Sequence, residues 1–155
     1  MNQNDPCDIL IVEDNPADAE LTVRSLKTYN LANRIYIAED GAEALDFILC
    51  KGRFSARNLM HPPKVVFLDL KLPKINGFEV LKEVRSNPAT KMLPVVVITS
   101  SREDSDIKSA YNLGANSYVV KPVDFDVFNR VINLIVHYWL LINEPSKNNS
   151  TNFIK

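Results

Sequence analysis

The chain has 155 residues, of which 46% are apolar and 24% charged, and its formal net charge is −1. This length suits one domain with its own core, and the balanced charge without a basic run argues against binding to nucleic acid or to a membrane surface. Because no leader-like stretch or run of ~18 apolar residues is present, and Cys7 and Cys50 are the only cysteines, we expect a cytoplasmic protein with free thiols and no membrane span.

Five short apolar segments are expected to form strands. In chain order they are Cys7–Val12, Arg34–Ala38, Val65–Leu68, Leu93–Thr99 and Ser117–Val120. Several are apolar at consecutive positions, which is typical of strands buried on both faces of a parallel sheet.

Segments with helical periodicity lie between these strands and carry start and stop signals. Three helix starts are predicted from polar capping residues, namely Asn15 before Pro16, Asp40 with Glu43, and Asn76 with Glu79. Gly52 and Gly114 follow apolar helical runs, where a left-handed residue is wanted to end a helix.

This order predicts an α/β fold of the flavodoxin-like type, (βα)5, with five parallel strands in a doubly wound sheet. We expect one domain over residues 1–143 and a polar, flexible tail over 144–155. The connection from Arg53 to Lys64 is expected to be a surface loop without an assigned role.

Chemically active side chains follow the strands at the edge where open parallel sheets bind ligands. These strand ends carry Glu13 with Asp14, Asp69, Thr99 and Lys121. Crowded carboxylates repel one another unless a hard cation lies among them, and Mg²⁺ (or Mn²⁺) prefers oxygen ligands. Asp69 is then suited to attack a phosphoryl group and form an acyl phosphate, with Lys121 and Thr99 beside the phosphoryl oxygens.

Together these segments resemble the receiver domain of two-component response regulators, of the chemotaxis-receiver type, over about Asp8–Leu141. The resemblance rests on VEDNP at 12–16, EDGAEAL at 39–45, FLDLKLPKINGFEVL at 67–81, VVVITS at 95–100 and GANSYVVKP at 114–122. The spacing of Asp69, Pro73 and Gly77 matches the family loop after the phosphoacceptor. The opening VEDNPADAEL and the end HYWLLINEPS resemble more specifically the regulators that partner bacterial phytochromes.

The resemblance implies that a sensor histidine kinase, of the phytochrome type by the narrower match, phosphorylates Asp69. Asp14 and Asp69 would bind Mg²⁺ directly, together with the backbone carbonyl of Lys71, and Glu13 would help through water.

On the same basis, Thr99 and Lys121 bind the phosphoryl group, and Tyr118 acts with Thr99 as the switch. The family also places a cis peptide bond before Pro122. Such a protein is a stand-alone switch rather than an enzyme, with only slow self-catalysed phosphotransfer and dephosphorylation. It would signal to a downstream protein or phosphotransfer partner by contact.

Other interpretations remain open. A phosphatase with an aspartyl nucleophile wants a second acid two residues later, where this chain has Lys71. A constitutive adaptor would have the same fold without phosphorylation. Tyr118 also suits simple core packing. Lys71 and Ser101 lie two positions beyond Asp69 and Thr99; the resemblance implies that they flank the attacking water and tune the lifetime of the phosphoryl group, and plain solvation is the alternative.

The last helix, about Val123–Ile142, is too apolar for one buried side. Phe128, Ile132, Ile135 and Trp139 form a stripe that we assign to the sheet. A second stripe contains Val127, Val131, Leu134 and Tyr138. Excess apolar surface marks an interface, so we expect a homodimer through this helix, the alternative being that a neighbouring helix or the tail covers it.

Overall fold

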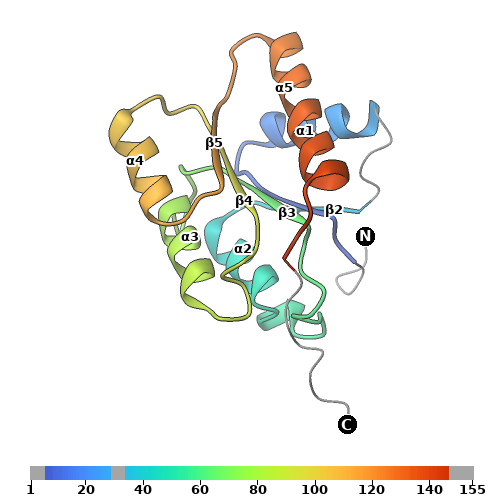
Figure 1. The fold of residues 1–155 in the computed structure, drawn as a ribbon, viewed down its shortest axis with the longest axis vertical. Helices are drawn as coiled ribbons and strands as arrows, with labels where there is room; N and C mark the ends of the chain where they lie inside the picture. The colour runs from blue at the N-terminus through green and yellow to red at the C-terminus, as the bar shows by residue number, and fades with distance from the viewer. Residues whose placement is uncertain (1–5, 29–33, 147–155) are drawn as a thin grey trace.

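The structure is a computed structural model that describes residues 6–28 and 34–146. Its elements are, in order, β1 (Ile9–Val12), α1 (Pro16–Thr28), β2 (Ile35–Ala38), α2 (Gly41–Ile48), the 3-10 helix η1 (Gly52–Phe54), β3 (Val65–Leu68), α3 (Gly77–Ser86), β4 (Val95–Thr99), α4 (Asp104–Asn112), β5 (Ser117–Val120), α5 (Phe125–His137) and the π-helix η2 (Tyr138–Ile142). The strands form one parallel sheet in the order β2-β1-β3-β4-β5 (Figure 1). The predicted flavodoxin-like (βα)5 fold is confirmed.

Helices cover both faces of this sheet. α1 and α5 lie side by side on one face, and α2, α3 and α4 lie on the other (Figure 1). Successive strand residues point to opposite faces, so Ile9 and Ile11 pack with α1 and α5, whereas Leu10 and Val12 pack with α2 and α3. All residues of β1, β3 and β4 are therefore buried, which accounts for their unbroken apolar sequence.

The predicted helix starts are present with one difference. Asn15 accepts hydrogen bonds from the N–H groups of Ala17 and Asp18, and Asn76 and Glu79 form a reciprocal capping box. Asp40 accepts from the N–H of Glu43, but the Glu43 side chain accepts from Glu39 instead of completing the box.

The segment after α2 differs from the prediction. The left-handed residue that follows the helix end is Cys50, with a φ of 53°, and Gly52, also at a φ of 53°, begins η1. Phe54 in this turn is buried, with its ring 5.2 Å from that of Phe47. The prediction of a surface loop over Arg53–Lys64 is therefore wrong at Phe54, because an aromatic side chain there completes the core beside α2.

The ends of several elements also differ. β1, β2 and β4 begin at Ile9, Ile35 and Val95, one or two residues later than predicted, and α5 begins at Phe125. No cis peptide bond occurs within residues 6–28 and 34–146, so the implied cis bond before Pro122 is not found. The predicted tail lies outside the described residues from 147 onward.

The last helix requires a second correction. Contrary to the expectation from sequence, the 18 residues Phe125–Ile142 are long and apolar enough to cross a bilayer by length and composition, with a mean hydropathy of 1.3. Phe128, Ile132 and Val136 of this helix are buried in the core formed with the sheet and α1. The inner face of the helix therefore belongs to the core of the domain.

Candidate functional site

The ends of four strands bring the predicted site residues to one edge of the sheet. The N–H of Asp69, after β3, donates to the carbonyl of Val12 in β1, and the N–H of Lys121, after β5, donates to the carbonyl of Thr99 in β4. Glu13 and Asp14 directly follow β1. The strand ends that carry the predicted side chains therefore lie next to one another.

Gly77 explains how the loop after Asp69 folds so tightly. A Cβ atom at this position would lie 2.3 Å from the backbone oxygen of Asp69 and 2.7 Å from the Cα of Leu70. The N–H of Gly77 also donates to the carbonyl of Leu70. Only glycine lets α3 begin this close to the strand end, so Gly77 helps to fix Asp69 in place.

Lys121 is the centre of the charge network at this edge. Its ammonium group lies 2.5 Å from Glu13 Oε2, 2.9 Å from Asp69 Oδ2 and 3.0 Å from Asp18 Oδ2. Burial alone would lower the pKa of Lys121, but the hydrogen bonds that it donates to Glu13 and Asp69 outweigh burial and raise the pKa above its usual value. Lys121 therefore stays protonated and places a positive charge beside Asp69.

For Glu13, burial has a larger effect on the pKa than the hydrogen bond from Lys121. Its burial raises the pKa to about 7, although the hydrogen bond from Lys121 favours the charged form. The nearby charge of Asp69 adds to the increase. One ammonium group does not compensate the negative charge collected at this edge.

Three of the acids are close enough to share a cation. Glu13, Asp14 and Asp69 each offer a carboxylate oxygen, and these oxygens lie within 4.8 Å of one another. Hard oxygen donors at this spacing suit a divalent cation such as Mg²⁺ or Mn²⁺. The set therefore fits the metal predicted from sequence.

The remaining predicted metal ligand is the backbone carbonyl of Lys71. The contact that the structure gives for this residue is from its N–H, which donates to Asp69 Oδ1 at 3.3 Å. This bond orients the Asp69 carboxylate. The ligand role of the carbonyl stays a prediction.

Thr99 and Tyr118 line the neighbouring side of the site. Thr99 is fully buried, and its Oγ1 has no hydrogen-bond partner among the described residues. Tyr118 donates its hydroxyl to the carbonyl of Ser101 at 3.0 Å, and its partial burial raises its pKa. A buried hydroxyl without a partner is costly in a finished core, and the binding of a phosphoryl group by Thr99 stays a prediction.

Ser101 is not the solvated loop residue of the alternative interpretation. It is buried, and its hydroxyl donates to Asp106 Oδ2 at 2.6 Å. The loop after β4 is therefore held both by Tyr118 and by the start of α4.

Sequence reasoning missed Asp18. This residue lies in the first turn of α1, and the pattern gave no reason to separate it from the ordinary acids of a helix start. The available signal was its place four residues after Asp14, because α1 begins at Pro16, shortly after β1 ends at Val12.

Three of the four residues of the second apolar stripe, which runs along α5 into η2, are exposed. Leu134 is 72% exposed, Tyr138 and Val127 are also exposed, and Val131 is half-buried. Leu141 and Ile142 of η2 extend this apolar surface. Within the described residues, the alternative that another helix covers these side chains is not supported.

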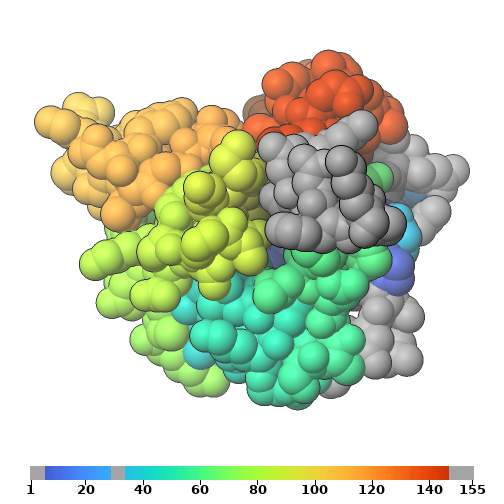
Figure 2. All heavy atoms as spheres, turned by 60° about the horizontal axis from the view of Figure 1, so that its bottom comes forward, coloured from blue at the N-terminus to red at the C-terminus, as the bar shows by residue number. Residues whose placement is uncertain are grey.

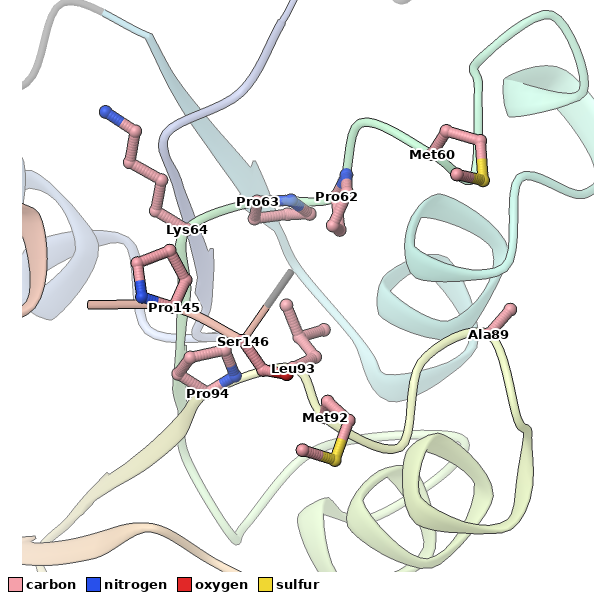
Figure 3. Close-up of a pocket in the computed structure, with 10 residues that line it drawn as sticks. All are labelled: Met60, Pro62, Pro63, Lys64, Ala89, Met92, Leu93, Pro94, Pro145 and Ser146. Atoms are coloured by element: carbon pink, nitrogen blue, oxygen red, sulfur yellow. The ribbon is translucent and has the colours of Figure 1, made fainter. Parts of the chain in front are cut away.

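A groove of about 300 Å³ lies at the other edge of the sheet, next to the starts of β3 and β4. Figure 2 shows this side of the molecule, where the connection before β3 and the loop before β4 are neighbours. Its lining is mainly methionine, proline and leucine, and Lys64 is its one charged residue (Figure 3). This groove offers apolar contact but no acid–base or metal chemistry.

Known proteins resemble the chain over most of its length. The response regulator receiver domain family matches residues 9–133. The chain is 40% identical over 141 residues to the probable methanogenesis regulatory protein FilR2 of Methanothrix harundinacea (strain 6Ac), covering 90% of this chain and 88% of that protein. It is 36% identical over 137 residues to the response regulator Rcp1 of Synechocystis sp. (strain ATCC 27184 / PCC 6803 / Kazusa), covering 88% and 91%.

Solved structures agree with the sequence relatives. The Mn(2+)-bound form of Rcp1 has a TM-score of 0.82 at 34% identity, covering 89% of this chain and 97% of that one. The phosphorylated cyanobacterial phytochrome response regulator RcpA has a TM-score of 0.83 at 32% identity, with 88% and 96% covered. The bacteriophytochrome response regulator RtBRR has a TM-score of 0.71 at 46% identity, with 89% and 82% covered.

Proposed function

Because the chain belongs to the response regulator receiver domain family, we propose that it is a signalling switch whose phosphoacceptor is Asp69. The single observation that carries this proposal is the position of the Asp69 carboxylate, which is bonded to Lys121 and lies within one acidic group with Glu13 and Asp14. A sensor histidine kinase is the proposed donor. Receiver domains are signalling switches rather than conventional enzymes, and slow self-catalysed phosphotransfer and dephosphorylation are part of the proposal.

Glu13, Asp14 and Asp69, with the carbonyl of Lys71, would hold a divalent cation. Rcp1, a relative, has been crystallised with Mn²⁺, and we propose Mg²⁺ as the physiological ion. When bound, such an ion offsets the charge on the phosphoryl oxygens as they approach an anionic nucleophile.

The residues of the chain supply the rest of the transfer. An oxygen of Asp69 forms a bond to phosphorus while the phosphorus–nitrogen bond of the donor phosphohistidine breaks. The electron pair of that bond stays on the imidazole nitrogen, which takes up a proton from water. Lys121 moves to a phosphoryl oxygen from its present place beside Asp69 Oδ2. Thr99 donates its unpartnered hydroxyl to another.

The switch follows from the loss of the resting contacts. When Thr99 moves toward the phosphoryl group, the loop after β4 moves with it, and the bond from Tyr118 to Ser101 must change. Tyr118 then rearranges, which alters the surface around α4, β5 and α5. A local charge thus biases an element with two arrangements.

Mass spectrometry of the intact protein tests the phosphoacceptor. Incubation with phosphoramidate and Mg²⁺ is expected to add one phosphoryl group to wild type and none to Asp69→Asn. Asp126→Asn, an exposed acid of α5, serves as the matched control. A wild-type protein that gains no mass, or an Asp69→Asn variant that gains as much, contradicts the assignment.

We propose that the kinase is of the phytochrome type. Two similar structures belong to a cyanobacterial phytochrome response regulator and a bacteriophytochrome response regulator, the latter at 46% identity. Phosphotransfer from each histidine kinase of the same organism tests this. The proposal expects the fastest transfer from a phytochrome-type kinase, and preferential transfer from another class contradicts it.

We also propose a cytoplasmic homodimer through the outer face of α5. Leu134 and Tyr138 are exposed on this face, and a two-fold contact would bury them against their own copies. Light scattering is expected to give the mass of two chains for wild type and of one chain for Leu134→Lys. Met92→Lys, which changes an equally apolar exposed residue near β4, is expected to stay dimeric. A wild-type mass of one chain at tens of micromolar contradicts the proposed dimer.

A further inference from the structure

Lys121 is shared by three carboxylates, and one of them stands apart. Glu13 and Asp69 are buried and belong to the acidic group that suits a cation. Asp18 is 37% exposed, and among the described residues it is not a member of such a group. Its contact with Lys121 therefore has no explanation in the metal site.

The position of Asp18 is fixed by the start of α1. The side chain of Asn15 accepts hydrogen bonds from the N–H groups of Ala17 and Asp18, which fixes the first turn of the helix shortly after the end of β1. The carboxylate of Asp18 then reaches Lys121 Nζ at 3.0 Å from the solvent side, while Asp69 Oδ2 lies 2.9 Å from the same atom.

We propose that Asp18 is the resting counter-ion of Lys121, which competes with the phosphoryl group for the ammonium and so weakens the affinity of the site for phosphoryl ligands. This proposal rests on the proposed function of Asp69. When a phosphoryl group arrives, Lys121 leaves Asp18 for a phosphoryl oxygen, and the Asp18 carboxylate turns into water.

The partial exposure of Asp18 makes this exchange feasible. A carboxylate at the surface recovers its hydration when it loses an ion pair, so the exchange has a small cost on its side. A buried acid such as Glu13 has no such replacement. Asp18 nevertheless keeps its charge a few ångströms from the bound dianion, and like charges at that distance repel even in a largely aqueous setting.

Beryllofluoride, an anionic mimic of a phosphoryl group, provides a test that does not require turnover. Thermal shift titrations with Mg²⁺ present are expected to give an affinity roughly three- to ten-fold higher for Asp18→Asn than for wild type. The difference should shrink as salt is added, because the charge is exposed. Asp18→Glu keeps the charge and is expected to stay near wild type.

Glu20→Gln is the matched control. Glu20 lies on the same helix and is paired with Arg24 rather than with Lys121, so its neutralisation is expected to leave the affinity unchanged. If Asp18 only stabilises the helix start, Asp18→Asn lowers the melting temperature without changing the affinity, and that result overturns the proposal.

A weaker affinity in Asp18→Asn also overturns it, because Asp18 would then position Lys121 for the ligand. Failure of the proposed function has a different signature. In that case neither wild type nor any variant binds beryllofluoride, and wild type gains no mass from phosphoramidate.

Discussion

Strand β1 is followed and preceded by a buried acid, and the two acids have opposite surroundings. Asp8, before the strand, accepts two bonds from Arg34, at 2.8 and 3.0 Å, and lies 3.4 Å from Lys64. At the other end, Glu13, Asp18 and Asp69 share the single ammonium group of Lys121, and Asp14 lies within the same acidic group. One end has more cations than anions, and the other has more anions than cations.

The contrast distinguishes a structural end and a functional end of the same strand. The carboxylate of Asp8 is paired with both Arg34 and Lys64, so this end needs no further cation. The carboxyl end holds uncompensated carboxylates and a buried hydroxyl of Thr99 without a partner. Such an arrangement is destabilising unless a cation and an anion complete it, which is a common property of functional sites.

The largest expected difference between the two ends of β1 is in how each makes the free energy of unfolding depend on pH. Burial raises the pKa of Glu13 from 4.5 to about 7, so the folded protein holds a proton that the unfolded chain loses between these values. The free energy of unfolding of the metal-free protein should therefore fall, by about 3 kcal/mol, as pH rises through this range.

Urea unfolding with a chelator present, at pH 5 and pH 8, measures this effect. Glu13→Gln is expected to remove most of the fall, and Asp8→Asn is expected to keep it. If the free energy of unfolding falls equally with pH in wild type and in Glu13→Gln, the proposed difference between the two ends is contradicted.

A divalent metal ion should stabilise the folded protein only by binding at the carboxyl end of β1. At a Mg²⁺ concentration one hundred times its dissociation constant, binding raises the free energy of unfolding by about 2.7 kcal/mol. Calorimetric melting with and without Mg²⁺ should show this gain in wild type and Asp8→Asn. Asp14→Asn, which removes one of the three acids, is expected to lose it, and an unchanged gain in that variant contradicts the site.

Neutralising the compensated acid should destabilise the protein. In Asp8→Asn the charged bonds to Arg34 are lost, and because the guanidinium side chain is 46% exposed, water replaces part of them. We expect a decrease of about 1 kcal/mol in the free energy of unfolding. Urea unfolding measures it, and a stabilised variant would contradict the compensated character of this end.

Neutralising an acid at the carboxyl end of β1 should instead raise the free energy of unfolding. Asp14 is exposed and receives no side-chain hydrogen bond among the described residues, so Asp14→Asn removes repulsion without removing a bond. The metal-free variant should be more stable than wild type by about 0.5 kcal/mol. The same unfolding experiment applies, and a clear loss of stability would show that the charges are already balanced.

Much of this contrast could be predicted from sequence. The apolar strands, the capping residues Asn15 and Asn76, and the active acids at the strand ends follow from local rules and from parallel topology. Buried Phe54 could not be predicted in the same way, because its burial comes from packing against the rings of Tyr36 and Phe47, which no local rule gives. The left-handed Cys50 was missed because Gly52, two residues later, is the residue type that local rules favour for this conformation. Asp18 was missed because its partner Lys121 is 103 positions away.

The most direct test of the central claim is to locate the acyl phosphate chemically. Borohydride reduces an aspartyl phosphate to homoserine, which peptide mass spectrometry assigns to one position. After incubation with phosphoramidate and Mg²⁺, we predict homoserine at position 69 alone, and none when the metal is chelated. Homoserine at Asp14 or Asp18 instead, or at no position, would contradict the account.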